Sequence, residues 1–372
     1  MNFDYSDEQQ MLLESAGRLM TARGTVEQWR ARRALADGLD AAGWAQFAEL
    51  GWLALPIAED AGGLGGSMED VALLMTAFGR GLAVEPYVST AVLGAHIVAA
   101  AVGEQRTALL EAIAGGAARL ALAHNELADR FDIASPRATL ATSGAEGFVV
   151  HGAKTLALDA PSANFLIVSA TLDGGEGTAL LLVPRDGPGV SLDSYPLIDG
   201  SWAADVGLAE VSVPHGALLA SGAAGSDILA RAIDRATVAL LGQAVGSMES
   251  CLEICSAYAK ERRQFGQPIG KFQALQHMMA DMLVAAHQAR SILYQAIAAV
   301  DGDAVARTCA VSAAKIVIGE AMQLVSRNGI QLFGGYGLTD EYAIGHHYRR
   351  LFVIEKAYGD IDHHVQRLAN AA

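Results

Sequence analysis

The sequence predicts an α+β protein with a helical amino-terminal domain, a middle antiparallel β domain and a carboxy-terminal helical bundle. Three observations predict this order. Apolar residues recur at helical spacing up to about residue 118, short alternating or β-branched runs follow to about residue 222, and long amphipathic patterns fill the remainder. We therefore expect domains at 1–118, 119–222 and 223–372.

The amino-terminal domain shows helical patterns separated by a glycine-rich loop. The segment LDAAGWAQFAELGWLAL (39–55) has apolar residues at helical spacing, and Asp70 to Phe78 repeats the pattern. Residues 56–70, PIAEDAGGLGGSMED, lie between them and indicate a loop. An alanine-rich run from Val88 to Ala118 completes this domain.

The middle domain contains short runs that are typical of strands. GFVVHG, NFLIVSAT, TALLLVP and AEVSVP are alternating or β-branched, and DGGEG and PRDGPG between them are typical of turns. These short runs with turn residues between them predict an antiparallel β domain.

The carboxy-terminal domain carries three long amphipathic patterns, at 226–260, 273–300 and 304–333, and a shorter fourth begins near Tyr342. Helices of this length with turns between them predict a bundle.

The composition argues against several classes of function. Hydrophobic residues make up 52% of the 372 residues and charged residues 18%, which favours extensive burial over disorder. The net charge of −15, without a basic cluster, argues against nucleic acid and anionic membranes as partners. No apolar run reaches about 18 residues without a charge, and the acidic amino terminus is unlike a secretory signal. We therefore expect no membrane insertion and a cytoplasmic protein.

We expect no metal site. Cys251 and Cys255 lie four residues apart in a helical stretch, but no histidine or further cysteine completes a site at ligand spacing. The run from Asp360 to His364 also fails to converge on one ion, because successive side chains on a helix point about 100° apart. This run is expected to be a solvated or capped helix start.

Two motifs carry the strongest signal in the chain. They read ERRQFGQPIGKFQALQHMMADM (261–282) and QLFGGYGLTDEYAIGHHYRR (331–350). Together they resemble the carboxy-terminal domain of the flavin-dependent acyl-CoA dehydrogenases. The resemblance extends over nearly the whole chain, because DYSDEQQMLLES and LGWLALPIAEDAGGLGG look like the opening helix and glycine-rich loop of that family. It implies the family's three-domain fold.

The resemblance implies an FAD cofactor, with the first motif reaching the diphosphate of a flavin in a neighbouring subunit. A guanidinium suits a pyrophosphate, and paired glycines let the backbone approach a ligand. The alternatives are a helix-capping Arg262 and a simple helix C-cap at Gly334 and Gly335. By resemblance, the FAD contacts are Arg262, Gln264, Phe265, Gln273, Gln331, Leu332, Phe333, Gly334, Gly335, Asp360 and Asp362.

The β domain departs from the family pattern at two flavin-binding segments. Where the family carries a Thr-Glu-Pro segment that ends in Gly-Ser-Asp, residues 125–132 read NELADRFD. Where it carries Trp-Ile-Thr, this chain has Leu156, Ala157 and Leu158. The aromatic platform and the hydroxyl for flavin N5 are both missing, whereas the elements for the adenine and diphosphate of the partner's flavin look intact.

The usual catalytic base is also replaced. Ungapped counting from Gly335 puts Gly359 in the family's Glu-Gly pair, so Tyr358 takes the base position, and a phenol with a reference pKa of about 10 is a hydrogen-bond donor at neutral pH. A minority of the family places the base before an Arg in the first bundle helix. Asp234 and Arg235 match that pair, as candidate base and candidate substrate-binding residue. Alternatively, Asp234 is a carboxylate near a helix start that pairs with Arg231 or Arg235.

These features resemble the small subunits of bacterial heteromeric acyl-CoA dehydrogenases, of the sterol side-chain and pimeloyl-CoA type. The resemblance implies one subunit of a heterotetramer that acts on an acyl-CoA substrate with a larger dehydrogenase subunit and an electron-transfer flavoprotein as acceptor. The alternatives are a non-catalytic partner that completes the FAD site of the larger subunit, a homotetramer that uses Asp234, and a flavin oxidase or monooxygenase of the same fold.

Overall fold

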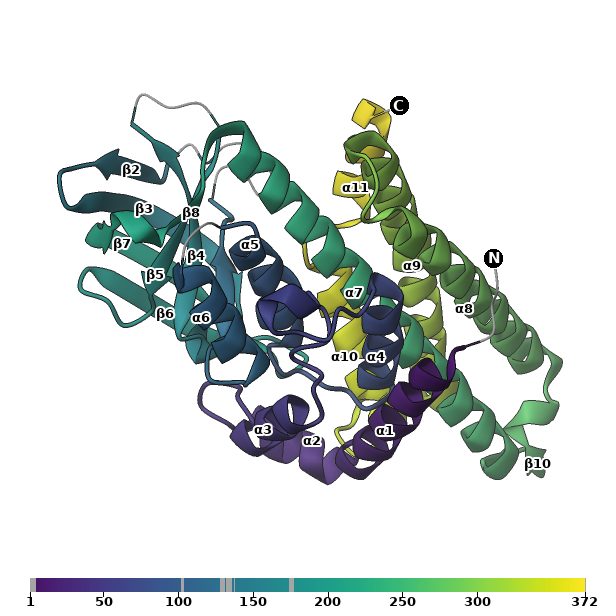
Figure 1. Ribbon diagram of the computed structural model, residues 1–372. Helices are drawn as coiled ribbons and strands as arrows, with labels where there is room; N and C mark the ends of the chain where they lie inside the picture. The colour runs from purple at the N-terminus through teal and green to yellow at the C-terminus, as the bar shows by residue number, and fades with distance from the viewer. Residues whose placement is uncertain are drawn as a thin grey trace. The chain divides into compact units, whose positions relative to one another are not determined.

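The computed structural model describes residues 5–101, 104–127, 131, 136, 138–173 and 177–371 (Figure 1). The order of helical, β and helical segments is confirmed. By spatial contact the chain forms two units. Unit 1 contains residues 1–31, 68–83 and 237–372, and unit 2 contains 32–67 and 84–236. The domain boundaries at 118 and 222 stay a prediction.

The amino-terminal segment is helical, and local hydrogen bonds fix where its first helix begins. Ser6 and Gln9 form a reciprocal capping box at the start of α1, each side chain accepting the other's main-chain N–H, at 3.2 and 3.1 Å. A stretch of π-helix, η2, is buried throughout. The helices of this segment are α1 (Asp7–Arg23), α2 (Val26–Arg33), α3 (Ala41–Glu49), η1 (Glu59–Ala61), α4 (Met68–Arg80), η2 (Val88–Gly94), α5 (Ala95–Ala99) and α6 (Glu104–Ala114).

The β domain is a mixed sheet, which corrects the expectation of a purely antiparallel one. Its strands follow the order β6-β7-β3-β2-β4-β5-β8, and β1 also pairs with β4. Both β1 and β2 run parallel to β4, while the other pairs are antiparallel. Alternation and turn residues predict strands but do not encode which strand lies beside which. The strands are β1 (Leu120–Ala123), β2 (Leu140–Ser143), β3 (Gly147–Leu158), β4 (Phe165–Leu172), β5 (Ala179–Pro184), β6 (Val190–Pro196), β7 (Trp202–Pro214) and β8 (Leu218–Ala220), with the short helices η3 (Ala160–Ser162) and η4 (His215–Ala217).

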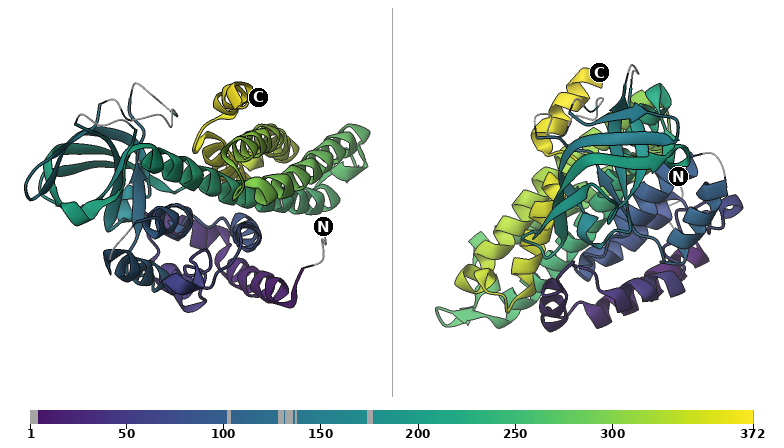
Figure 2. Two further views of the ribbon diagram at one scale, coloured as in Figure 1. Left: turned by 45° about the horizontal axis from the view of Figure 1, so that its top comes forward. Right: turned by 90° about the vertical axis from the view of Figure 1, so that its left-hand side faces the viewer.

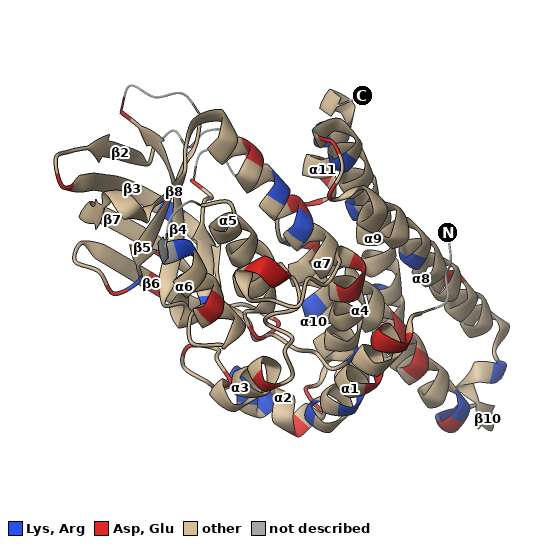
Figure 3. Cartoon of the chain, viewed as in Figure 1, with Lys and Arg blue, Asp and Glu red and all other residues tan. Residues whose placement is uncertain are grey.

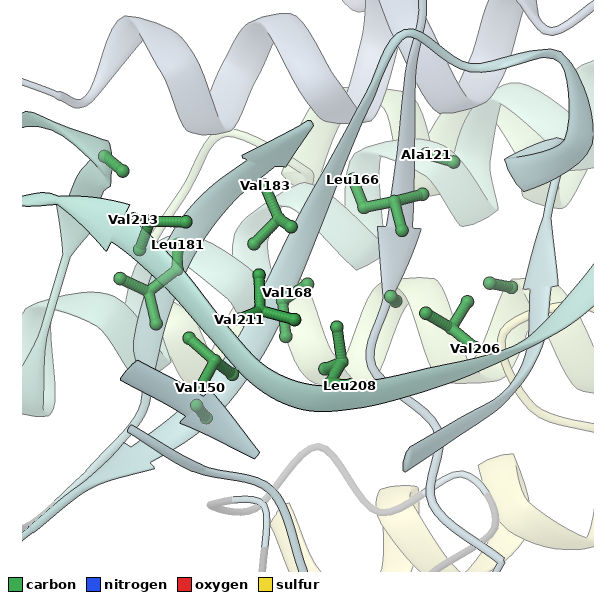
Figure 4. Close-up of a cluster of buried hydrophobic side chains, with 14 of the residues drawn as sticks. Ala121, Val150, Leu166, Val168, Leu181, Val183, Val206, Leu208, Val211 and Val213 are labelled. Atoms are coloured by element: carbon green, nitrogen blue, oxygen red, sulfur yellow. The ribbon is translucent and has the colours of Figure 1, made fainter. Parts of the chain in front are cut away.

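The core of this domain is built from aliphatic side chains on facing strands (Figure 4). Val150 of β3, Val168 of β4 and Val206 of β7 are each at most 1% exposed. Strand β4 is buried along most of its length, so its sequence is an almost continuous apolar run rather than an alternating one.

A buried ion pair lies within the same domain. Lys154 of β3 is fully buried, and its Nζ donates to Glu126 Oε1 (2.8 Å), Ser169 Oγ (3.2 Å) and the His124 carbonyl (3.2 Å). The Glu126 carboxylate also accepts the main-chain N–H of two residues, 138 and 139, at 2.8 and 2.9 Å. Every ammonium proton therefore has an acceptor, which offsets the cost of removing the charge from water.

The carboxy-terminal helices lie in unit 1, apart from the first part of α7, and α8 and α9 run side by side (Figures 1 and 2). The predicted segments 226–260, 273–300 and 304–333 correspond to α7, α8 and α9, and the fourth to α10; α11 follows the helix start expected at Asp360–His364. The elements are α7 (Gly222–Glu261), β9 (Arg263–Gln264), β10 (Gln267–Pro268), η5 (Ile269–Lys271), α8 (Gln273–Ala299), α9 (Ala304–Phe333), η6 (Gly334–Leu338), α10 (Ala343–Lys356) and α11 (Ile361–Ala371).

Helix α4 crosses α7 with the two backbones in contact. A Cβ added at Gly79 would lie 1.9 Å from the Gln243 carbonyl oxygen, and one added at Gly246 would lie 1.9 Å from the Thr76 carbonyl oxygen. The Gln243 amide then joins neighbouring elements, because it donates to the Ala83 carbonyl (2.7 Å) and accepts from Arg350 of α10 (2.6 Å). Glycine is the only residue that permits this approach.

Two helical segments, Gly222–Glu261 and Ala304–Leu338, are long and apolar enough to cross a membrane. In the most apolar window of each, 78% and 56% of the residues are buried inside the structure, as in core helices of a folded domain.

The buried ion pair predicts loss of stability in acid. Burial alone would raise the pKa of Glu126. Hydrogen bonds from Lys154 and from the Ala138 amide instead lower this pKa to about 2, from an ordinary 4.5. A carboxyl whose pKa is depressed on folding stabilises the fold above its unfolded pKa, and this contribution is lost as the pH falls toward the folded value. Between pH 4.5 and 2 we expect a loss on the order of 2 kcal/mol from this group.

Urea unfolding at a series of pH values checks this. Glu126→Gln should flatten the acid slope of the unfolding free energy relative to the parent chain. Glu146 is an exposed residue in the β2–β3 turn, so Glu146→Gln should keep the parent slope. Equal slopes for all three proteins would contradict the expectation.

Candidate functional site

A short hairpin projects from the end of α7. Strands β9 and β10 pair through Gln264 and Gln267, and the loop between them is Phe265-Gly266. Both loop residues have positive φ, +52° and +82°, as a two-residue type I′ turn requires. The Phe265 side chain is 90% exposed, and its ring meets that of Phe272 edge-on with 6.0 Å between centroids. The hairpin thus presents an aromatic ring to solvent.

The two motifs recognised in the sequence meet in space. The Arg262 guanidinium lies 5.3 Å from the centroid of the Tyr336 ring, and Tyr258 stacks on Phe333 with centroids 3.9 Å apart. Tyr342 packs edge-on against Phe333 and Tyr336. The end of α7 and the end of α9 therefore form one aromatic and cationic surface, although they are far apart along the chain.

The paired glycines after α9 form the helix cap, one of the two roles that the sequence offered. Gly334 has φ +60°, and its N–H donates to the carbonyls of Ile330 and Gln331, which caps the helix. A Cβ added at Gly334 or Gly335 would meet no atom within 4 Å, so the backbone there faces open space. The Gln331 side chain is exposed, whereas Leu332 and Phe333 are buried and contribute their side chains to the core.

Helix α8 begins beside the hairpin without a side-chain cap. Its N-cap residue, Phe272, makes no capping hydrogen bond, and Gln273 is exposed at the first helical position. The first N–H groups of a helix carry a partial positive charge that suits phosphate. Basic residues also mark the end of α7 (Figure 3). Arg262, the open glycine backbone and this helix start fit the adenine and diphosphate part of FAD.

The β domain offers little to a flavin ring in its described part. In the first predicted segment, residues 128–130 and 132 lie outside the described residues. In the second, Leu156 is 36% exposed with φ +50°, and its N–H donates to Asp205 (2.9 Å). Asp205 also accepts from the Tyr195 hydroxyl, and burial together with this bond raises the pKa of Tyr195 to about 12. The side chains at positions 156 and 158 are aliphatic, so they supply no hydrogen bond to a flavin ring.

Asp234 is fully buried in α7, and Arg235 is half-buried next to it. The alternative that put Asp234 near a helix start is wrong, because α7 begins at Gly222 and Asp234 is more than three turns along it. The dipole of the helix amino terminus acts only within the first turn, so it does not stabilise this carboxylate. On the same helix, Arg231 approaches Asp227 at 4.0 Å.

Tyr358 lies in the joint between α10 and α11, which we define as Ala357–Asp360. Tyr358 and Gly359 both have positive φ, +55° and +109°. Asp360 caps α11, since its Oδ1 accepts the His363 N–H at 3.0 Å, which agrees with the expected capped helix start. Asp362 is exposed in the first turn of that helix.

A buried lysine holds this joint from α9. The Nζ of Lys315 donates to the carbonyls of Ile354 (2.8 Å) and Ala357 (2.7 Å), the last acceptors of α10. Burial lowers the pKa of Lys315 to about 7, against the attraction of Glu355 and Asp360.

His364 holds the joint from the other side. Its Nε2 lies 3.2 Å from the Tyr358 carbonyl and its Nδ1 lies 3.2 Å from Ser312 Oγ. Burial and the nearby Lys315 lower the pKa of His364 to about 2, so the ring is neutral at physiological pH. A carbonyl only accepts, so Nε2 carries the proton and Nδ1 accepts from the Ser312 hydroxyl.

A cavity of about 130 Å³ lies between α9 and α10. Its lining includes Ser326 and Arg327 from α9, and Tyr348, Glu355 and Lys356 from α10. The Lys356 ammonium bridges Glu355 (2.9 Å) and Asp360 (3.6 Å), which ties the cavity wall to the joint.

Sequence reasoning missed Lys315 and His364. The available signal was a lysine inside the apolar stripe of α9, where Ser312, Lys315 and Gly319 recur at i, i+3 and i+7 and all are buried. A lysine on a buried helix face requires acceptors, and the carbonyls at the end of a neighbouring helix supply them.

Comparison with known proteins agrees with this arrangement. The family model for the acyl-CoA dehydrogenase C-terminal domain matches residues 223–372, and the model for the N-terminal domain matches residues 6–117. A probable acyl-CoA dehydrogenase of Bacillus subtilis (strain 168), YngJ, is 30% identical over 389 aligned positions, which cover 100% of this chain and 99% of the relative.

Two solved structures are similar over almost their whole length. A chain of a variant of the Tcur3481-Tcur3483 steroid ACAD has a TM-score of 0.88 and 29% identity, covering 98% of this chain and 97% of that one. A chain of the ChsE4-ChsE5 complex from Mycobacterium tuberculosis has a TM-score of 0.90 and 23% identity, covering 100% and 98%. At 23% identity the second likeness shows the fold alone.

The geometry of the joint predicts that Gly359→Ala destabilises the chain by about 2 kcal/mol. A Cβ at Gly359 would lie 2.5 Å from His363 Cδ2 and 3.0 Å from His364 Nε2, in a left-handed backbone conformation. Denaturant unfolding measures the loss. Gly335→Ala is the control, because its Cβ would meet nothing within 4 Å, and a loss for Gly359→Ala no larger than for this control would contradict the expectation.

Proposed function

The chain belongs to the acyl-CoA dehydrogenase family, whose members use FAD to dehydrogenate acyl-CoA thioesters, and we propose that it is one subunit of a heterotetrameric enzyme of this kind. The observation that carries the proposal is the contact of Arg262 with Tyr336, which joins the two segments expected to hold the adenine and diphosphate of a flavin. The positions expected to serve the flavin ring and the base hold Leu156, Leu158 and Tyr358. Such a chain suits a subunit that completes a site with a partner.

One similar solved structure supports the heteromeric part of the proposal. It is named for a pair of proteins, Tcur3481 and Tcur3483, and is called a steroid ACAD. By the same reasoning, the partner is a larger dehydrogenase subunit, the substrate is a bulky CoA thioester of the steroid or dicarboxylic type, and an electron-transfer flavoprotein accepts the electrons. The complex would work in the cytoplasm.

The residues of this chain would bind and orient the cofactor. Bound FAD supplies the acceptor for the hydride that leaves the substrate. The Arg262 guanidinium would neutralise the diphosphate, and the exposed Phe265 ring would cover an aromatic part of the cofactor. The Gln273 and Gln331 side chains are exposed and can donate to it.

The proton on the α carbon of the substrate needs a base. Asp234 is the candidate on this chain, because it is fully buried and precedes Arg235 in the first bundle helix, where a minority of the family carries its base. The half-buried Arg235 would contact the substrate. If the partner supplies the base instead, this chain is a non-catalytic subunit, and the aliphatic residues at 156 and 158 favour that second candidate.

Flavin content tests whether the site is shared. Purified alone, the chain should contain little FAD. Co-expressed with a large acyl-CoA dehydrogenase subunit, it should form a mixed tetramer with one FAD per pair of subunits, because only the pair completes the site. Absorbance at the flavin maximum and the mass of the native complex measure both quantities. Stoichiometric FAD in a homotetramer would refute the partner-subunit proposal and leave a self-sufficient enzyme that uses Asp234.

Substitution of Asp234 tests the base. In the assembled complex, Asp234→Asn should lower kcat by about 10²- to 10⁴-fold while FAD stays bound, because a positioned general base contributes about that factor. Asp227→Asn on the same helix is the matched control and should leave kcat unchanged, since Asp227 is more than half exposed. Full activity of Asp234→Asn would assign the base to the partner. Oxygen consumption without an added electron acceptor would point instead to an oxidase or monooxygenase.

A further inference from the structure

The main chain of the joint is held on both sides of Tyr358. Lys315 binds the carbonyl of Ala357, which precedes Tyr358, and His364 binds the carbonyl of Tyr358 itself. Lys315 also takes the Ile354 carbonyl, and Ser312 orients the His364 ring. Helix α11 lies beside α9, so both groups approach the joint from packed, buried positions (Figure 2).

Tyr358 adopts a conformation that its own chemistry disfavours. At φ +55° the Cβ of an L-residue crowds the following carbonyl, and a bulky residue is rarely found there. Such strain persists only where the surroundings fix the backbone, and it is concentrated at functional sites. Here the surroundings are identified: two side-chain donors, one on each side of the strained residue.

We propose that Lys315 and His364 are positioning residues that hold Tyr358 in its left-handed conformation and so fix where this chain presents the phenol to the acyl-CoA site. The inference rests on the proposed function in one respect, namely that the joint borders that site. The phenol then acts as a fixed hydrogen-bond donor at the position where the family carries its base.

Main-chain capping at the end of α10 does not take the place of the Lys315 amine. A helix that ends in Gly at C′ satisfies its own last carbonyls through main-chain N–H groups. Helix α10 ends instead at Lys356, and Ala357 after it has an extended backbone. An amine from another helix binds the Ile354 and Ala357 carbonyls. Removing the amine leaves two buried carbonyls without this donor, so the joint should open more readily than the helices around it.

Amide hydrogen exchange of the assembled, FAD-loaded complex tests the proposal. Lys315→Met keeps the apolar length of the side chain and removes the donor. Peptides that cover residues 354–364 should exchange roughly tenfold faster than in the parent, while peptides from α8 should change much less. The matched control is Lys154→Met, which removes another fully buried lysine, in the β domain. In Lys154→Met, the ratio of the exchange rate at 354–364 to that in α8 should stay at its value in the parent chain.

Ser312→Ala is the milder variant if Lys315→Met does not fold. It removes only the hydroxyl that orients His364, so exchange at the joint should rise by roughly threefold. Joint exchange that is unchanged in Ser312→Ala, or that rises in Lys315→Met by the same factor as in α8, would overturn the positioning role.

Kinetics separate this inference from the proposed function. Lys315→Met and Tyr358→Phe should lower kcat by similar factors with a smaller change in KM, and the double variant should be no slower than the worse single one. A joint that loosens while kcat stays at the parent value in both variants would leave the positioning of Tyr358 standing and would refute its place at the acyl-CoA site.

Discussion

Every buried amine in this structure must find acceptors, and this requirement organises both units. In unit 2, Lys154 gathers a carboxylate, a hydroxyl and a carbonyl from three stretches of the β domain. In unit 1, Lys315 gathers the last carbonyls of α10. Neither lysine is exposed, so bulk water does not reach either amine. Apolar packing would tolerate small shifts between elements, whereas a buried amine accepts only the arrangement in which its acceptors are present.

The difference between local apolar patterns and contacts between distant residues explains which parts of the fold the sequence could predict. Helices α8 and α9 could be assigned almost to the residue, because their apolar periodicity is local and their ends carry ordinary signals, such as the Asp303 cap of α9. The parallel pairing of β1 with β4 could not, because register and neighbour choice depend on residues far apart in the chain. The helix predicted from Ser226 begins at Gly222, and with either start Asp234 lies beyond the first turn.

The candidate site could also be predicted only in part. The two motifs that contain Arg262 and Tyr336 were each recognised in the sequence, but the contact between them was not predicted. The joint at Tyr358 could be located by counting but not understood, since its conformation is imposed by Lys315 and His364 from other helices. The identity of a residue can be read from the sequence, but the backbone conformation that places its side chain is set by partners elsewhere in the fold. The contacts that hold the backbone on both sides of position 358 come from α9 and α11.

The crossing of α4 and α7 has a consequence for how this gene can vary. At Gly79 and Gly246 any Cβ would overlap a carbonyl oxygen of the opposite helix at 1.9 Å. Every single-base change of a glycine codon that alters the amino acid adds at least a Cβ, and most add more. These two codons therefore have no conservative neighbours in the genetic code. At these two points on the buried faces of α4 and α7, only silent mutations leave the helix crossing undisturbed.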